Sequence, residues 1–151
     1  TGRLFEASAK SAAMLSNKSI SFIENISKAA KLIGIAFQVR DDLLDYGISK
    51  GNIGKPEMQD ILEDKITYPL YFALKSSSKK DTSRILKKIK NKDFNAEEVS
   101  DFVSSSDAFN KCNSLIQSYS NEISKCINKI SNKEIRNEML NLSESLKNRY
   151  E

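Results

Sequence analysis

The chain has 151 residues, a hydrophobic content of 39% and a formal net charge of +4. This length is enough for one domain with a buried core. The sequence contains no apolar run long enough to span a bilayer. Histidine is absent, which excludes histidine-based catalysis and histidine metal sites. The basic residues are not interleaved with aromatic residues as a nucleic-acid platform requires, so we expect no nucleic-acid partner.

Two helices are expected before residue 47. The first covers residues 2–15, contains many small residues that permit close packing, and shows an apolar stripe of Leu4, Phe5, Ala12 and Leu15. The second begins behind a cap at Ser19 or Ser21 and runs to about Tyr46. Its apolar positions recur at steps of three and four, as an amphipathic helix requires: Phe22, Ile23, Ile26, Ala30, Ile33 and Phe37.

The rest of the chain also predicts helices, separated by polar links. Residues 47–58 contain three glycines and a proline and therefore predict a loop. Helices are then expected at about 67–75, at 80–90, at 96–104 behind a cap at Asn95, from Asp107 to about Ile130, and from Lys133 onward. We expect the aromatic residues 68, 71 and 72 in the core. No useful stretch alternates with period two, so the predicted fold class is all-α.

Both cysteines, Cys112 and Cys126, fall in the helix expected from Asp107. Residues fourteen positions apart lie about 21 Å apart along a helix axis, which is too far for a disulfide within that helix. We expect two free, buried thiols.

Basic residues are dense between Lys79 and Lys92. A solvated helix face is the favoured interpretation, because the lysines spread around the expected helix. A weak attraction to an anionic membrane surface is the alternative that the same charges allow.

The strongest local signal is the run Asp41-Asp42-Leu43-Leu44-Asp45. Asp41 and Asp45 share a helix face, with Asp42 beside them, although like charges at this spacing destabilise a helix by about 0.2–0.5 kcal/mol. Such carboxylates suit Mg²⁺, which binds carboxylate oxygens together with substrate phosphates and water. The solvated face of an amphipathic helix would show the same pentapeptide, so the motif alone leaves both interpretations open.

Lysines follow this acidic motif. Lys55 lies on the glycine-rich loop, and Asp60 and Lys65 precede the helix expected near Thr67. Because lysine neutralises phosphate charge, this arrangement favours a diphosphate site. An ordinary surface loop with surface lysines is the alternative.

Taken in order, these motifs resemble those of the trans-isoprenyl (polyprenyl) diphosphate synthases. In that family, Lys-Thr is followed by a small residue and then by a helix that begins with Leu-Phe. The motifs G-x-A-F-Q-x-x-D-D-x-x-D-Y, a G-K-P loop and D-x-x-E-x-K-x-T-x-P-L come next. The corresponding residues here are Thr1-Gly2-Arg3-Leu4-Phe5, Gly34-Ile35-Ala36-Phe37-Gln38 with the three aspartates and Tyr46, Gly54-Lys55-Pro56, and Asp60, Glu63, Lys65, Thr67, Pro69 and Leu70. This ordered series covers roughly the first half of the chain.

The resemblance implies an all-α bundle of the isoprenoid synthase type, with residues 1–151 as the C-terminal part of a single domain. It also implies a cytoplasmic, homodimeric, Mg²⁺-dependent prenyltransferase of isoprenoid biosynthesis. Such an enzyme condenses an allylic diphosphate with isopentenyl diphosphate to make a polyprenyl diphosphate, with three Mg²⁺ ions in the complete enzyme. The diphosphate leaves, the double bond of isopentenyl diphosphate attacks the allylic carbon, and a proton is lost.

The resemblance also assigns roles to individual residues. The metal ligands it implies are Asp41, which binds Mg²⁺ directly, and Asp42 and Asp45, which bind it directly or through water. The catalytic residues are Asp41, Asp42 and Lys55, and the substrate-binding residues are Thr1, Gln38, Lys55 and Lys65. Asp60 is a further candidate.

The chain also departs from the family pattern. The first DDxxD motif, the residues that bind isopentenyl diphosphate and the lysine before Thr1 lie upstream in the family and are not in this sequence. We therefore expect a missing N-terminal part and no condensation by these residues alone. Two alternatives are a non-catalytic partner subunit of a heteromeric prenyl synthase and a related terpene or squalene synthase-like enzyme. The intact aspartates argue against the first, and the G-K-P and K-x-T-x-P runs argue against the second.

Overall fold

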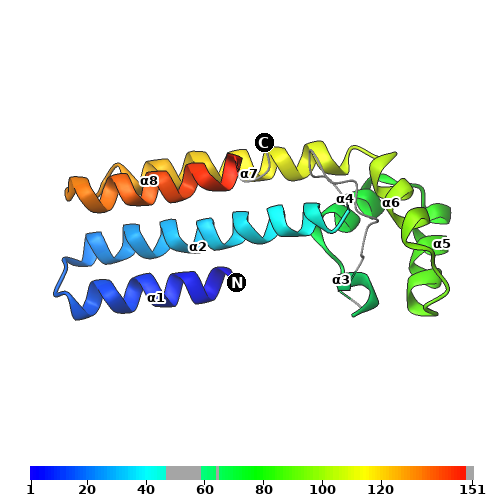
Figure 1. The fold of residues 1–151 in the computed structure, drawn as a ribbon, viewed down its shortest axis with the longest axis horizontal. Helices are drawn as coiled ribbons and strands as arrows, with labels where there is room; N and C mark the ends of the chain where they lie inside the picture. The colour runs from blue at the N-terminus through cyan, green and yellow to red at the C-terminus, as the bar shows by residue number, and fades with distance from the viewer. Residues whose placement is uncertain (47–58, 64, 149–151) are drawn as a thin grey trace. The chain divides into compact units, whose positions relative to one another are not determined.

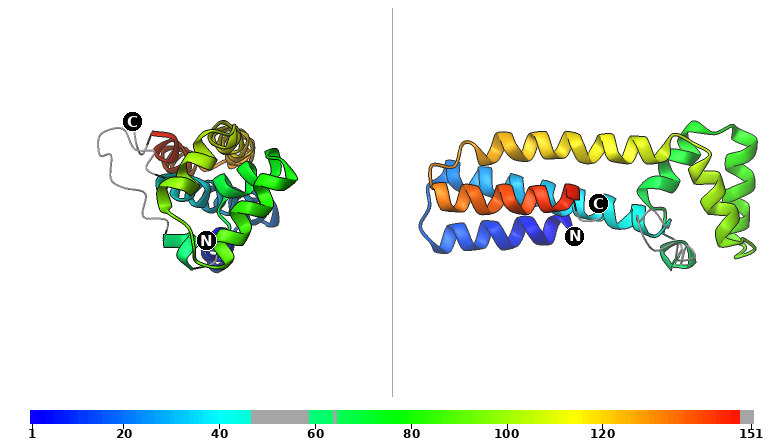
Figure 2. Two further views of the ribbon diagram at one scale, coloured as in Figure 1. Left: turned by 90° about the vertical axis from the view of Figure 1, so that its right-hand side faces the viewer. Right: turned by 45° about the horizontal axis from the view of Figure 1, so that its top comes forward.

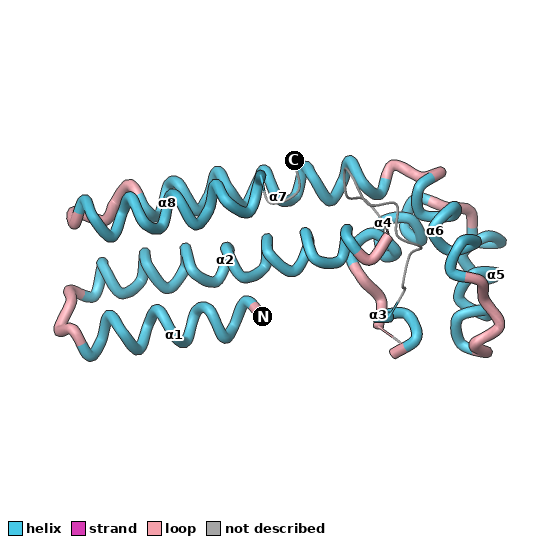
Figure 3. The backbone as a smooth tube through the Cα atoms, viewed as in Figure 1, coloured by secondary structure: helices cyan, strands magenta, loops and turns pink. Residues whose placement is uncertain are grey.

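The computed structural model describes residues 1–46, 59–63 and 65–148, and its regular secondary structure in these ranges is helical (Figure 3). Figure 1 labels the helices in chain order: α1 (Gly2–Leu15), α2 (Ile20–Leu44), α3 (Gln59–Leu62), α4 (Tyr68–Ser76), α5 (Lys79–Lys90), α6 (Ala96–Ser104), α7 (Ala108–Ile127) and α8 (Lys133–Asn148). The predicted all-α class is confirmed. Within these ranges, no helix combines the length and the hydrophobicity needed to cross a membrane.

The chain folds as two compact units. The first unit comprises Thr1–Gln38 and Leu115–Glu151, and the second comprises Val39–Ser114. The boundaries fall inside α2 and inside α7, so each of these two helices contributes residues to both units.

In the first unit, α1 and α2 lie side by side (Figure 1 and Figure 2), and their close contact depends on glycine. A Cβ atom added to Gly34 would lie only 2.9 Å from the Cα atom of Gly2. A Cβ atom added to Gly2 would lie 2.7 Å from Cγ1 of Ile35. The two backbones therefore approach each other more closely than larger residues would allow.

The apolar stripe expected on α1 is wrong except at Phe5. Leu4 and Leu15 are 69% and 85% exposed, and Ala12 is also exposed. The packed side chains are Phe5, Ala9 and Ala13, which share a face of the helix with Gly2. The physical reason is the short distance between the helices, which small side chains permit and leucines would prevent.

Aliphatic and small residues form the interior of the first unit. Two buried clusters among its described residues comprise Ala29, Ile33, Ala36, Ile123, Cys126 and Ile127, and Ala13, Ile26 and Ile130. The face predicted for α2 is confirmed, because its six positions are buried or partly buried. On the surface of this unit, Lys28 pairs with Glu122 at 3.2 Å.

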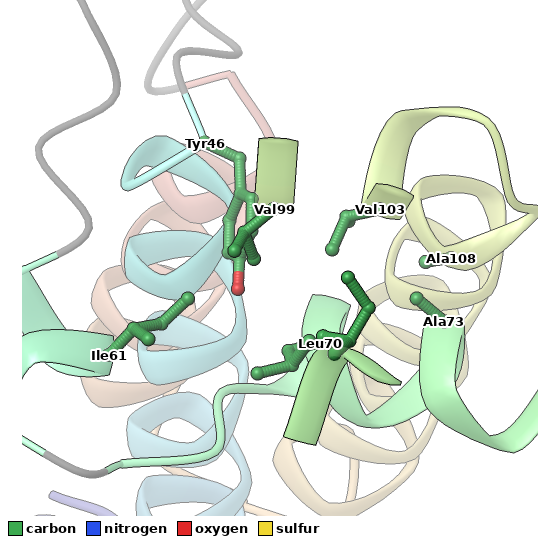
Figure 4. Close-up of a cluster of buried hydrophobic side chains, with 8 residues drawn as sticks. Tyr46, Ile61, Leu70, Ala73, Val99, Val103 and Ala108 are labelled. Carbon is green, nitrogen blue, oxygen red and sulfur yellow. The ribbon is translucent and has the colours of Figure 1, made fainter. Parts of the chain in front are cut away.

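The second unit packs α4, α5 and α6 around another cluster, shown in Figure 4, which comprises Tyr46, Ile61, Leu70, Ala73, Ile85, Val99, Val103 and Ala108. The predicted cap at Asn95 is confirmed, since its side chain accepts a hydrogen bond from the Glu97 N–H at 2.9 Å. The expectation that Tyr71 lies in the core is wrong. Its side chain is 48% exposed and faces the Lys75 ammonium at 5.7 Å, because its position on α4 points away from Leu70 and Ala73.

Two further expectations have outcomes in the structure. Cys112 and Cys126 are both free and buried, as expected. On α5, Lys79, Lys80, Arg84 and Lys87 are exposed, as on a solvated helix face, and Lys88 reaches Glu98 at 2.7 Å. The short helix α3 was not expected, because four residues carry too little periodicity to predict a helix.

Candidate functional site

The three aspartates of the acidic motif occupy different environments at the end of α2. Asp41 is exposed, Asp45 is partly buried, and only 5% of Asp42 is exposed. A purely solvated helix face would leave all three in water, so this interpretation is wrong for Asp42. Burial of a carboxylate is costly without compensating hydrogen bonds, and Asp42 has such a bond.

Asp42 binds the N-terminus of α4. Its Oδ2 atom accepts a hydrogen bond from the backbone N–H of Tyr68 at 3.0 Å. Tyr68 is the first residue of α4, where backbone N–H groups have no acceptor within the helix. The next residue is Pro69, which has no N–H to satisfy. An anion at this end of a helix is also favoured by the helix dipole.

Thr67 and Tyr46 make a second buried contact at the same place. The Thr67 side chain occupies the cap position of α4 but makes no hydrogen bond to that helix. Its hydroxyl instead lies 2.9 Å from the hydroxyl of Tyr46, and both residues are 5% exposed. Asp42 and Tyr46, which precede α3, therefore form hydrogen bonds with the consecutive residues Tyr68 and Thr67 at the start of α4.

The surroundings of Tyr46 keep its hydroxyl protonated. Burial, the largest cause, raises the pKa of Tyr46 above its ordinary value, while the hydrogen bond with Thr67 acts in the opposite direction. The ring of Phe109 lies edge-on to Tyr46, with 6.4 Å between the ring centroids. Tyr46 belongs to the buried cluster of Figure 4, which also contains Val99. A protonated hydroxyl can donate to Thr67 or accept from it.

Cys112 is a buried thiol in the same unit. Burial and, secondarily, the negative charge of Asp42 raise the pKa of Cys112 to about 12. The thiol is therefore protonated at neutral pH, and the thiolate needed for nucleophilic or metal chemistry is scarce.

Lys65 lies in an acidic environment. Its Nζ atom lies 2.7 Å from Glu63 and 3.1 Å from Asp60. The hydrogen bond to Glu63 and then that to Asp60 raise the pKa of Lys65 above its ordinary value. The Lys65 side chain is 58% exposed, so it is accessible to an anionic ligand that replaces these carboxylates.

Thr1 and Gln38, both assigned to substrate binding by the resemblance, lie together in the first unit. The Thr1 hydroxyl donates a hydrogen bond to Oε1 of Gln38 at 2.6 Å. The close packing of α1 on α2 at Gly2 and Gly34 places these residues near each other. The remaining candidate, Lys55, lies outside the described residues.

The donors at the end of α2 have the chemistry that Mg²⁺ requires, since carboxylate oxygens are its preferred protein ligands. Asp41 and Asp45 are one helical turn apart in sequence. In the ranges that the structure describes, however, no three acidic or cysteine side chains form a group that could hold a metal ion. Asp41 and Asp45 thus offer oxygen donors of the right kind without, in the described ranges, a closed set of protein ligands around them.

Sequence reasoning assigned no role to Tyr46 or Thr67, although both stand in the quoted motifs. One signal was available, because a threonine two residues before a proline is typical of a helix N-terminus. Its bond to Tyr46, 21 positions away in the sequence, could not be inferred from that local pattern.

Comparison with known proteins gives a consistent result. A model of the polyprenyl synthetase family matches residues 1–106. The chain is 42% identical over 77 residues to the large subunit 1 of a chloroplastic heterodimeric geranylgeranyl pyrophosphate synthase of Arabidopsis thaliana. The aligned region is 51% of this chain and 21% of that protein. It is also 34% identical over 103 residues to a short chain isoprenyl diphosphate synthase of Methanocaldococcus jannaschii. Here the aligned region is 68% of this chain and 32% of that protein.

Solved structures share the fold. A decaprenyl diphosphate synthase from Rhodobacter capsulatus superposes with a TM-score of 0.88 at 22% identity, covering 100% of this chain and 47% of that one. A polyprenyl synthase from Caulobacter crescentus, complexed with calcium and isoprenyl diphosphate, has a TM-score of 0.84 at 22% identity, with the same coverage. The chain thus spans about half the length of these structures, and its matches cover about a third or less of the two curated relatives.

Proposed function

Because the chain belongs to the polyprenyl synthetase family, we propose that it is the C-terminal half of a trans-polyprenyl diphosphate synthase. The complete enzyme condenses an allylic diphosphate with isopentenyl diphosphate to make a polyprenyl diphosphate. The observation that carries this proposal is the family match over residues 1–106, which includes every candidate site residue. The homodimer, the cytoplasmic location and weak binding to membrane surfaces stay predictions of the sequence.

The metal site of this proposal is centred on Asp41 and Asp45. Asp41 is exposed and can reach a ligand in solvent, and Asp45 follows one turn later. Bound Mg²⁺ supplies electrostatic stabilisation of a diphosphate leaving group. The Caulobacter relative is complexed with calcium, another hard cation that binds oxygen ligands. Asp42, which the resemblance also assigns to the metal, is buried against the start of α4 and is not included in this site.

Four residues are proposed to bind substrate. Lys65 would exchange its contacts with Glu63 and Asp60 for phosphate oxygens, which attract the same ammonium group. Lys55 would supply a second positive charge. In the first unit, Thr1 and Gln38 are proposed to contact substrate through their paired side chains, because a hydroxyl and an amide can both bind phosphate oxygens.

A second candidate function is supported by one comparison. The Arabidopsis relative is named as the large subunit of a heterodimeric synthase. The present chain could by analogy belong to one subunit of a heteromeric enzyme. The two functions differ in whether the purified protein turns over without a second polypeptide.

The experiment is product analysis with the complete purified protein, farnesyl diphosphate, isopentenyl diphosphate and Mg²⁺. We expect a longer polyprenyl diphosphate, no product after chelation of the metal, and a loss of about 100-fold or more in Asp41→Asn. The matched control is Asp93→Asn, which removes an exposed carboxylate outside the candidate site. Absence of product with a correctly folded protein and saturating Mg²⁺ would contradict the single-chain proposal, and activity restored by a second subunit would support the heteromeric one.

A further inference from the structure

We propose that Asp42 is a positioning residue that caps α4, and that it is not one of the metal ligands. Asp42, Tyr46, Thr67 and the backbone N–H of Tyr68 form what we call the α4 anchor. The anchor itself follows from the contacts in the second unit, and its consequence for catalysis rests on the proposed function.

The geometry gives the first argument. Asp42 and Tyr46 are four positions apart, so they are separated by about one helical turn. Each binds one of two consecutive residues, Asp42 the N–H of Tyr68 at 3.0 Å and Tyr46 the hydroxyl of Thr67 at 2.9 Å. Two contacts at adjacent residues fix both the position and the direction of the chain entering α4.

Burial gives the second argument. Asp42, Tyr46 and Thr67 are each only 5% exposed. Hydrogen bonds between buried polar groups are strengthened by the low local dielectric. Removing one partner leaves the other buried without a hydrogen bond, which destabilises the folded state. A carboxylate that is already buried and accepting an N–H is poorly placed to bind a hydrated cation, which reaches exposed oxygens more easily. Its sequence neighbour Asp41 is exposed.

The start of α4 gives the third argument. Thr67 is at the cap position, where a threonine side chain usually accepts a hydrogen bond from its own helix. Here it makes no such bond, and its hydroxyl pairs with that of Tyr46. Asp42, 26 positions away in the sequence, instead accepts from a different first-turn N–H, that of Tyr68. A charged acceptor makes a stronger bond than a neutral one, which compensates for the unused threonine.

The anchor has a consequence for Lys65. This lysine lies two residues before Thr67, and its own backbone N–H bonds the Asp60 carbonyl at 2.9 Å. Its position is therefore limited by the anchor on one side and by α3 on the other. Loosening the anchor releases the segment that carries the proposed diphosphate-binding ammonium.

A matched set of variants in the complete protein tests the role of Asp42. Asp42→Asn keeps a carbonyl oxygen that can accept from the Tyr68 N–H but is a poor magnesium ligand, whereas Asp42→Ala removes the acceptor. We expect Asp42→Asn to keep kcat within about tenfold of the wild type and to leave the Mg²⁺ concentration for half-maximal activity unchanged. Asp41→Asn should lose about 100-fold and need more Mg²⁺. An Asp42→Asn variant that loses activity and shifts its Mg²⁺ requirement as Asp41→Asn does would overturn the proposal.

Hydrogen exchange of the Tyr68 amide tests the anchor without depending on activity. We expect protection in the wild type, in Asp41→Asn and in Asp42→Asn, and at least tenfold faster exchange in Asp42→Ala. If Asp42→Ala does not fold, Thr67→Ser and Thr67→Val provide the second comparison, since only the former keeps the hydroxyl that bonds Tyr46. Unchanged Tyr68 exchange in Asp42→Ala, or equal exchange in the two Thr67 variants, would overturn the anchor. An inactive wild type with an intact exchange pattern would instead refute the proposed function alone.

Discussion

The two units of this chain differ in the contacts that hold their helices together. In the first unit, α1 meets α2 at Gly2 and Gly34, and aliphatic and small residues fill the interior. In the second unit, a buried carboxylate and two buried hydroxyls join the end of α2 to the start of α4. Apolar contacts accept many partners, whereas buried polar groups require specific ones. The polar contacts therefore occur where the direction of the chain entering α4 is fixed.

The largest effect is expected from a substitution that separates the helices of the first unit. Gly34→Leu should destabilise the protein by about 3 kcal/mol, because its side chain would collide with the backbone at Gly2. Chemical denaturation measures this change. Glu24→Leu, at an exposed position on the same helix, is the control and should change stability by about 0.5 kcal/mol or less. Equal stability of Gly34→Leu and the wild type would show that the helices do not pack at this distance.

A smaller effect is expected from the hydroxyl pair of the second unit. Thr67→Val and Tyr46→Phe should each cost about 1–2 kcal/mol, because each leaves the other hydroxyl buried without its partner. The double variant should cost less than the sum of the two, since no unsatisfied hydroxyl then remains. Denaturation of all four proteins gives the coupling directly. Strict additivity would mean that the two hydroxyls do not interact.

The smallest effect is expected on the exposed face of the second unit. Lys88→Ala removes a contact of 2.7 Å to Glu98 in which both side chains are partly exposed. Such a pair contributes about 0.2–1 kcal/mol and is weakened by salt. Thermal unfolding at low and at high salt should show a difference from the wild type only at low salt, with the exposed Lys87→Ala as control. A loss above about 2 kcal/mol would place this pair among the buried interactions that hold the unit together.

The sequence predicted the helices better than their contacts. Steps of three and four identified the face of α2, and Asn95 was recognised as a cap because capping depends on neighbouring residues only. The face of α1 was predicted wrongly, since hydrophobicity favoured Leu4 and Leu15 whereas the short distance to α2 selects Ala9 and Ala13. The hydrophobic pattern of one helix does not indicate how closely a second helix packs against it.

The candidate site was predicted in the same uneven way. The ordered motifs singled out Asp41, Asp45 and Lys65, whose roles stay predictions, and they did not foresee the hydrogen bond between Thr1 and Gln38. They grouped Asp42 with Asp45 as a metal partner, because the local sequence does not tell the two carboxylates apart. Only the tertiary contact with Tyr68 separates one carboxylate from the other.

The most direct test of the central claim is calorimetric titration of the complete protein with an allylic diphosphate, with and without Mg²⁺. The account predicts binding that requires the metal and weakens by about tenfold or more in Asp41→Asn, equivalent to about 1.4 kcal/mol, while Asp93→Asn binds as the wild type does. Binding that persists after removal of the metal, or that is the same in Asp41→Asn, would contradict the assignment of this helix end to magnesium and diphosphate.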